Sequence, residues 1–181
     1  MKFLKFLTVG LTLIVMTGCS TYATNRYSIS ADSVVALKQY KDNEVGVGIF
    51  TATKPGQKSI MCRGVGPIKT PDGETFEGFV RKALISEMKM AEAYTENGKV
   101  ILSGVLNRID FNSNSGDWDI SLTVTSSNGK SLTIEEKYDY TTSFYGETAC
   151  NQTAQALMPA VQNVIIKLVS HENFSSLVNG I

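Results

Sequence analysis

The sequence predicts an α+β domain: a mainly antiparallel sheet of about five strands, with two helices packed on one face. Three observations lead to this prediction. Several segments alternate apolar and polar residues, which is typical of strands with one buried face. Two longer segments repeat apolar residues every three or four positions, as amphipathic helices do. Since one face of the strands is expected to be exposed to solvent, the helices are expected to cover the other face.

The domain is expected to begin with two strands. Residues 44–53 alternate, and Gly46 and Gly48 between the apolar positions indicate close approach by another backbone. Residues 58–65 form a second extended segment. Residues 33–40 before them fit either a strand or a short helix.

A helix is expected after the turn at residues 71–73. Thr75 is the expected N-cap or first-turn residue, and Asn97 and Gly98 are expected to end the helix. One apolar stripe runs along it, made of Phe76, Phe79, Val80, Ala83, Leu84 and Met88.

Three strands are expected to follow in succession, in residues 99–111, 117–126 and 131–140. Asn128-Gly129 between the last two predicts a hairpin with a type I′ turn, because that turn requires positive φ at both central positions.

The second helix is expected in residues 148–169, where Pro159 should kink it or divide it in two. Residues 174–178 are expected to form a short turn or helix that closes the edge. The predicted order is therefore β-β-α-β-β-β-α.

Length and composition limit the classes of protein. The chain has 181 residues, 43% hydrophobic and 19% charged, which is typical of one globular domain, expected in residues 32–181. No basic stripe is present, which argues against nucleic acid as a partner. Without Lys2 and Lys5 of the leader, the mature chain has a formal charge of −2.

Residues 1–18 are predicted to be a signal peptide. Two lysines precede a short apolar run, and small residues precede Cys19. The apolar run is too short for a comfortable transmembrane helix. The alternative is an ordinary secreted protein in which Cys19 is incidental.

The sequence MTGC, which ends at Cys19, resembles the lipobox of bacterial lipoprotein precursors. The resemblance implies that Cys19 is acylated and becomes the first residue of the mature protein. Ser20 follows in place of Asp, which by resemblance to enterobacterial sorting favours the inner leaflet of the outer membrane over the inner membrane. Residues 19–31 are polar and lack periodicity, so they are expected to form a flexible, lipid-anchored tether.

The remaining cysteines, Cys62 and Cys150, form an even pair in an oxidising compartment, for which a disulfide is the plain interpretation. A bond between them would close a loop of about 89 residues. Closing a loop of that length stabilises a fold by at most about 4.5 kcal/mol. The alternative is a reactive Cys62 thiol with a pKa lowered by Arg63. A zinc site with His171 fits no usual ligand spacing.

Residues 104–178 resemble small YajG-like lipoproteins in their strand, Asn-Gly hairpin, strand and Ala-rich helix. The segments CRGVGP and ETACNQTAQALMPAVQ resemble a wider set of proteobacterial hypothetical lipoproteins. In that set paired cysteines recur beside these segments, which implies that Cys62 pairs with Cys150. The resemblance implies a fold and a cellular location, and it implies no catalytic residues.

No catalytic constellation is recognised. The run from Gly64 to Pro67 lacks the glycine spacing of a phosphate loop. Asn114, Asp117 and Asp119 lack the pattern of a calcium loop. We therefore expect them to be solvent-exposed residues at the start of a strand. No metal or cofactor is therefore predicted.

Two further groups of residues are candidate sites. Glu135 and Glu136 should point to opposite faces of a strand, so they are not a carboxylate pair. The cluster of aromatic residues late in the chain is expected to be core or sheet edge, with a small binding surface as the alternative; it comprises Tyr138, Tyr140, Phe144 and Tyr145.

The sequence thus predicts a membrane-anchored, periplasm-facing lipoprotein that is a non-catalytic binding or accessory module for an envelope protein partner. One alternative is a carrier of an apolar ligand or lipid, based on Phe79, Met88, Met90 and Met158. The other is a cysteine-dependent enzyme that uses Cys62.

Overall fold

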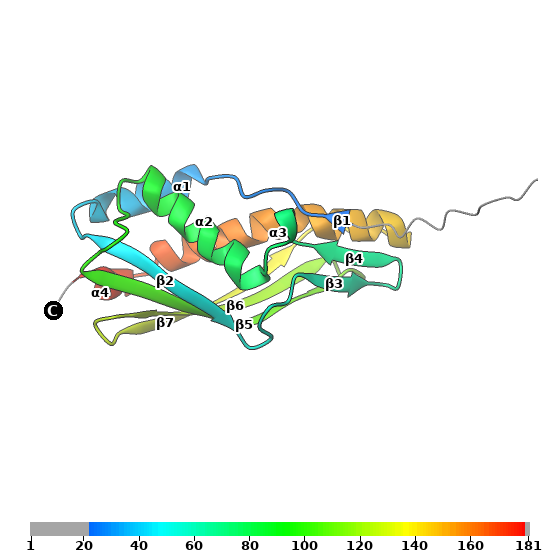
Figure 1. Ribbon diagram of the computed structural model, residues 1–181. Helices are drawn as coiled ribbons and strands as arrows, with labels where there is room; N and C mark the ends of the chain where they lie inside the picture. Colours follow the sequence, from blue (N-terminus) through cyan, green and yellow to red (C-terminus); the bar gives the residue numbers. More distant parts are fainter. Residues whose placement is uncertain (1–21, 180–181) are drawn as a thin grey trace, which may run out of the picture.

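A computed structural model describes residues 22–179 of the chain (Figure 1). The predicted signal peptide and Cys19 lie outside the described residues. Among residues 22–179, no helix combines the length and the apolar character needed to span a bilayer.

The main sheet has four strands in the order β2-β5-β6-β7. β5, β6 and β7 pair antiparallel in sequence, whereas β2 pairs parallel with β5. The strands are β2 (Val45–Ala52), β5 (Val100–Asn112), β6 (Asp117–Ser126) and β7 (Ser131–Asp139). The prediction of an α+β fold is confirmed, but that of a mainly antiparallel five-stranded sheet is wrong in two respects.

The first correction is the direction of β2. The helix α2 (Phe76–Met90) connects β2 to β5 across one face of the sheet. A strand, a crossover helix and a second strand in the same sheet run parallel, because the helix returns the chain to the end where it started.

The second correction concerns residues 58–69, which leave the main sheet. They form the hairpin of β3 (Ser59–Cys62) and β4 (Gly66–Lys69), and the short β1 (Tyr22–Ala23) pairs parallel with β4. The result is a separate sheet in the order β1-β4-β3. The extended segment expected at residues 58–65 stops where β4 begins, at Gly66, so the second strand of this hairpin was not predicted.

Helices cover one face of the main sheet (Figure 1). α3 (Gly146–Val169) contacts β6 and β7, α2 contacts β2 and β5, and α1 (Ala31–Leu37) packs against α2 and α3. α1 continues as a 3-10 turn (Lys38–Tyr40), a second 3-10 turn (Pro71–Gly73) precedes α2, and α4 (Phe174–Val178) lies beside the main sheet. The short turn or helix expected at residues 174–178 is the helix α4, and residues 33–40, which fitted either a strand or a helix, are helical.

α2 begins as predicted and ends earlier than predicted. The Thr75 hydroxyl accepts a hydrogen bond from the Gly78 N–H at 3.1 Å. The helix ends at Met90 because Glu92, with a φ of 59°, closes it in the left-handed conformation. The N–H groups of Glu92 and Ala93 donate to carbonyls of the last turn, a Schellman arrangement that glycine usually makes. Because position 92 is a glutamate and not a glycine, the sequence did not indicate that the helix ends there.

Two local predictions are corrected. Of the two effects expected at Pro159, the division of the helix is wrong, because α3 is one helix that contains this residue. The β6–β7 hairpin forms at Asn128-Gly129, but only Gly129 has a positive φ, of 85°. Its N–H donates to the Ser126 carbonyl at 2.9 Å, which is a type I turn followed by a left-handed glycine.

The prediction of a close backbone approach at β2 is confirmed at one position. A Cβ at Gly46 would lie 3.0 Å from the carbonyl oxygen of Thr95, so the loop after α2 runs directly against this strand. Gly48 instead faces side chains of β5, those of Ile101 and Ser103.

The core lies between the main sheet and the helices, and Trp118 is its largest buried side chain. The indole contacts the ring of Phe111 at a centroid distance of 4.9 Å and that of Phe76 at 6.5 Å. Its N–H donates to the Thr153 carbonyl at 2.9 Å, so β5, β6, α2 and α3 meet at one residue whose polar atom is satisfied.

Candidate functional site

Cys62 and Cys150 form a disulfide. Cys62 is the last residue of β3, Cys150 lies near the start of α3, and both are fully buried. The bond therefore ties the small sheet to the longest helix. Since both sulfurs are in the bond, the cysteine-enzyme alternative has no free thiol at Cys62.

Arg63, in the turn between β3 and β4, holds three segments together. Its guanidinium donates to the Ser113 hydroxyl at 2.9 Å and to the Ser113 carbonyl at 2.6 Å. It also donates to the Phe144 carbonyl at 3.1 Å. Ser113 lies in the β5–β6 turn and Phe144 in the β7–α3 loop, so Arg63 joins neighbouring turns instead of activating Cys62.

Three exposed apolar side chains lie near these turns, and we call Met61, Phe144 and Tyr145 the aromatic tip. Their exposed fractions are 61%, 94% and 75%. The two rings meet edge to face, with centroids 6.0 Å apart. Figure 1 shows the β3–β4 turn, the start of α3 and β1 at the same end of the molecule.

The aromatic cluster predicted from the sequence is therefore divided. Tyr138 and Tyr140 are part-buried against the core, and the Tyr140 and Thr153 hydroxyls share a hydrogen bond of 2.7 Å. Phe144 and Tyr145 instead project into solvent. These residues differ in burial although they are close in sequence. β7 ends at Asp139, and side chains in the loop that follows no longer alternate between the two faces of the sheet.

Residues 22–30, expected as part of a flexible tether, are bound to the domain. The Arg26 guanidinium pairs with Asp72 at 2.8 Å. The Gln162 amide donates to the Ser28 carbonyl at 2.6 Å. β1 adds its pairing with β4. The expectation fails because these contacts link residues far apart in sequence.

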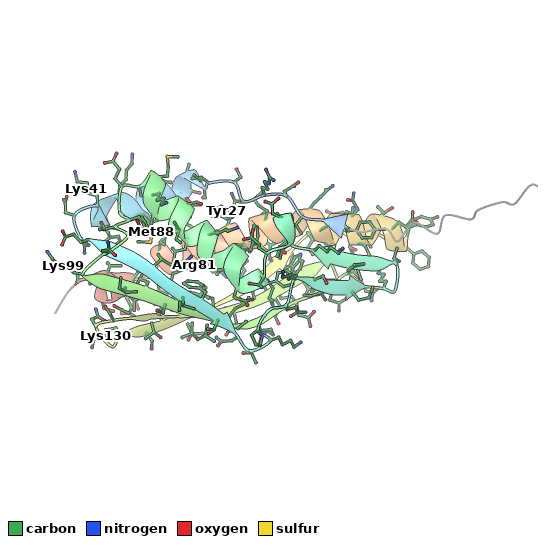
Figure 2. All side chains as sticks on the ribbon, in the orientation of Figure 1. Tyr27, Lys41, Arg81, Met88, Lys99 and Lys130 are labelled. Atoms are coloured by element: carbon green, nitrogen blue, oxygen red, sulfur yellow. A yellow bond between two sulfur atoms is a disulfide. The ribbon has the colours of Figure 1, made fainter. Side chains whose placement is uncertain are left out.

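The strongest anchor of this segment is Glu87 on α2. One oxygen of this buried carboxyl accepts the Tyr27 hydroxyl at 2.6 Å and the Ser30 N–H at 2.7 Å. Burial raises the pKa of Glu87 above its ordinary value, and these two hydrogen bonds oppose the rise only in part. Burial and the neighbouring Glu87 raise the Tyr27 pKa. Figure 2 shows Tyr27 beside α2.

A pocket of about 300 Å³ opens between the end of β2, the start of α2 and the middle of β5. Its wall combines an apolar floor with charged and amide groups. The lining residues are Ala52, Lys54, Gln57, Phe76, Glu77, Leu106, Asn107, Arg108, Ile109 and Asp110.

Glu77 and Gln57 line this pocket, and each has one buried oxygen without a partner among residues 22–179: Glu77 Oε2 and Gln57 Oε1. Glu77 is only 8% exposed, and its other oxygen accepts the Gly56 N–H at 2.9 Å. Arg108 is occupied on the outer sheet face by Asp119 at 2.8 Å and Glu135 at 2.9 Å. Both oxygens are closed to solvent, and a group that donates N–H bonds, such as an amide or ammonium, would satisfy them only after a shift of the lining side chains. The sequence shows Glu77 only as a first-turn acid of a helix, so this pocket was not predicted.

The other residues considered from the sequence have structural partners. Asp117 accepts the Ser115 hydroxyl, and the His171 Nδ1 accepts the Asn173 N–H at 3.1 Å. Within residues 22–179, no cluster of His, Cys, Asp and Glu side chains is arranged to hold a metal ion.

Glu135 and Glu136 point to opposite faces of β7, as predicted. Glu135, on the outer face, accepts the Ser121 hydroxyl at 2.6 Å. Glu136 is 3% exposed and pairs with Lys167 of α3 at 2.5 Å. The inner carboxylate therefore helps to fix α3 on the sheet.

Comparisons with known proteins add little. No family model matches the chain, and no curated protein is similar to it. The chain is similar to the crystal structure of a DUF330 protein from Xanthomonas campestris, with a TM-score of 0.49 and 9% identity over 87% of this chain and 99% of that one. A likeness this distant carries no argument about function. The YajG-like resemblance stays an expectation.

Proposed function

We propose that this chain is a lipoprotein anchored through Cys19 in the inner leaflet of the outer membrane, and that its domain faces the periplasm. The lipobox-like MTGC at residues 16–19 carries the proposal. Cys19 precedes the first described strand by three residues, so cleavage there removes the predicted signal peptide and leaves the domain intact.

We further propose that the domain is a non-catalytic binding module for an envelope protein. The pocket at Glu77 supports this role, because charged and amide side chains line it and its wall holds two unpartnered oxygens that an inserted amide or ammonium group would satisfy after a shift of the lining. The disulfide supports it too, since it assigns Cys62 and Cys150 a structural role. The disulfide leaves the cysteine-dependent enzyme without its proposed thiol.

The apolar-ligand carrier is less well supported. Phe79 and Met88 are 2% and 1% exposed and belong to the core, while Met90 is 56% exposed on the surface. Packing in the core explains Phe79 and Met88 without a ligand.

Metabolic labelling with palmitate tests the anchor. The wild-type chain should incorporate label and fractionate with the outer membrane, whereas a Cys19→Ala chain should stay unlabelled and unprocessed. A wild-type chain that is soluble and unlabelled contradicts the proposal.

Photo-crosslinking in living cells tests the binding role. A crosslinking residue replaces Asp110, which is exposed at the pocket, and in a matched control it replaces Val35, which is 70% exposed on α1. A reproducible protein adduct from position 110 alone is expected. No adduct, or the same adduct from both positions, contradicts a partner at this pocket.

A further inference from the structure

We propose that the aromatic tip, Met61, Phe144 and Tyr145, is seated in the headgroup layer of the bilayer that holds Cys19, so that the domain stands end-on on the membrane. The inference rests on the proposed acylation of Cys19 and specifies how the anchored domain is oriented.

The first argument is the direction of the chain as it enters the fold. β1 runs parallel to β4, with Tyr22 opposite Ile68 and Ala23 opposite Lys69. Tyr22, at the start of β1, therefore lies two positions after Gly66 in the register of β4, and because the two strands are parallel the start of β1 is directed toward the β3–β4 turn. Gly66 directly follows the β3–β4 turn, which contains Arg63 and contacts the β7–α3 loop.

The second argument is reach. Cys19 precedes Tyr22 by three residues, and an extended chain spans about 10 Å over that number of residues. The headgroup layer on each side of a bilayer is about 5–8 Å thick. An acyl chain on Cys19 in the hydrocarbon core therefore holds Tyr22, and with it the end of the molecule that carries the tip, at the membrane surface.

The third argument is the chemistry of that end. Phe144, at 94%, is the most exposed large hydrophobic side chain in residues 22–179, and its neighbour Tyr145 is 75% exposed. Exposed aromatic rings are unfavourable in water and favourable at the bilayer interface, where tyrosine keeps its hydroxyl among the headgroups. Apolar residues of this kind hold peripheral domains on membranes.

The fourth argument is that the tip is held in place before any contact with lipid. Arg63 donates to the Phe144 carbonyl at 3.1 Å, and the disulfide fixes β3, which carries Met61, to α3. The backbone that carries the tip is therefore already ordered, so binding costs conformational entropy only at the exposed side chains. Figure 2 shows Lys41, Lys99 and Lys130 at the other end of the molecule, which suits a surface that stays in water.

Depth-dependent fluorescence quenching tests the orientation on the intact lipidated protein. Trp118 is the only native tryptophan and is fully buried, so the wild-type emission provides the background. Phe144→Trp places a reporter in the tip. Val35→Trp places a matched reporter on α1, away from the β3–β4 turn, at a residue that is also exposed. Each purified lipoprotein is reconstituted into vesicles of phosphatidylethanolamine and phosphatidylglycerol, with or without brominated acyl chains.

The added emission of Phe144→Trp should shift to the blue on reconstitution and be lost in large part in brominated vesicles. The added emission of Val35→Trp should do neither. Tyr145→Trp is a second tip reporter and should behave as Phe144→Trp does.

Two other outcomes are distinguishable. If the protein carries the acyl mass and floats with the vesicles, while the reporters at 144, 145 and 35 are equally unquenched, the orientation is wrong and the anchor stands. If mass spectrometry finds no acyl group and the protein does not float, the proposed function fails and this inference fails with it.

Discussion

At the scale of single residues, Glu87 has the largest local consequence. Its carboxyl lies on the inward side of α2, where a continuous apolar stripe alone would be expected, and it binds two donors of residues 22–30. The cost of burying this acid is offset by fixing the entry of the chain into the fold.

The raised pKa of Glu87 predicts a specific pH dependence. The folded state holds the Glu87 proton more tightly than the unfolded state, whose pKa is near the ordinary 4.5. As pH rises from that value through the folded pKa, the folded state binds more protons, so the free energy of unfolding falls. Glu87→Gln cannot titrate. The stability of the wild type relative to Glu87→Gln should therefore be greatest in acid and decline across this window, as urea unfolding at a series of pH values will measure. A constant difference contradicts the assignment.

Tyr27→Phe tests the same contact from the other side. The change removes the hydroxyl that donates to Glu87 at 2.6 Å and keeps the ring against Phe79. We expect the free energy of unfolding to fall by about 1–2 kcal/mol. Tyr145→Phe, at an exposed ring, is the control and should change it by less than about 0.5 kcal/mol. Equal effects would show that the Tyr27 hydroxyl is unimportant.

At the scale of elements, periodicity was a good guide where an element meets a single surface. The stripe of α2 and the alternation in β6 are read correctly from the sequence, because burial on one side of an element follows its own repeat. The ends and the partners of elements were less well predicted. The end of α2 depends on Glu92 in a conformation that favours glycine, and the direction of β2 depends on the crossover through α2.

The link between β3 and α3 predicts the effect of removing the disulfide. Cys62→Ala with Cys150→Ala opens a loop whose ends are 88 residues apart, which should lower the free energy of unfolding by about 2–4 kcal/mol. Urea unfolding measures this. Reduction of the wild type should lower its stability in the same direction, while the double variant should not respond to reductant. An oxidised wild type no more stable than the double variant contradicts a stabilising role.

At the scale of the whole molecule, residues 22–30 belong to the folded domain. They cross the helical layer and bind α2, α3 and β4. If Cys19 carries the proposed acyl group, it precedes the folded domain by only three residues, so the domain lies close to the bilayer.

Truncation tests this integration. A chain that starts at residue 31 should lose at least about 2 kcal/mol of unfolding free energy, because it loses the two bonds to Glu87 and the packing of Tyr27. A chain that starts at Tyr22 is the control and should match the mature domain in thermal and urea unfolding. If both truncations are equally stable, residues 22–30 contribute nothing to the fold.

The sequence by itself determined the α+β class, the helices around residues 76–90 and 146–169, and the three strands of the antiparallel half. Each of these follows from a local repeat of apolar residues. Acylation at Cys19 stays a prediction from sequence. Only the tertiary structure decided the separate small sheet, the binding of residues 22–30 and the pocket at Glu77. These features depend on pairs such as Tyr27 with Glu87, 60 residues apart, and Arg63 with Ser113, 50 apart. No local pattern encodes such pairs, because they form only when the chain has already folded.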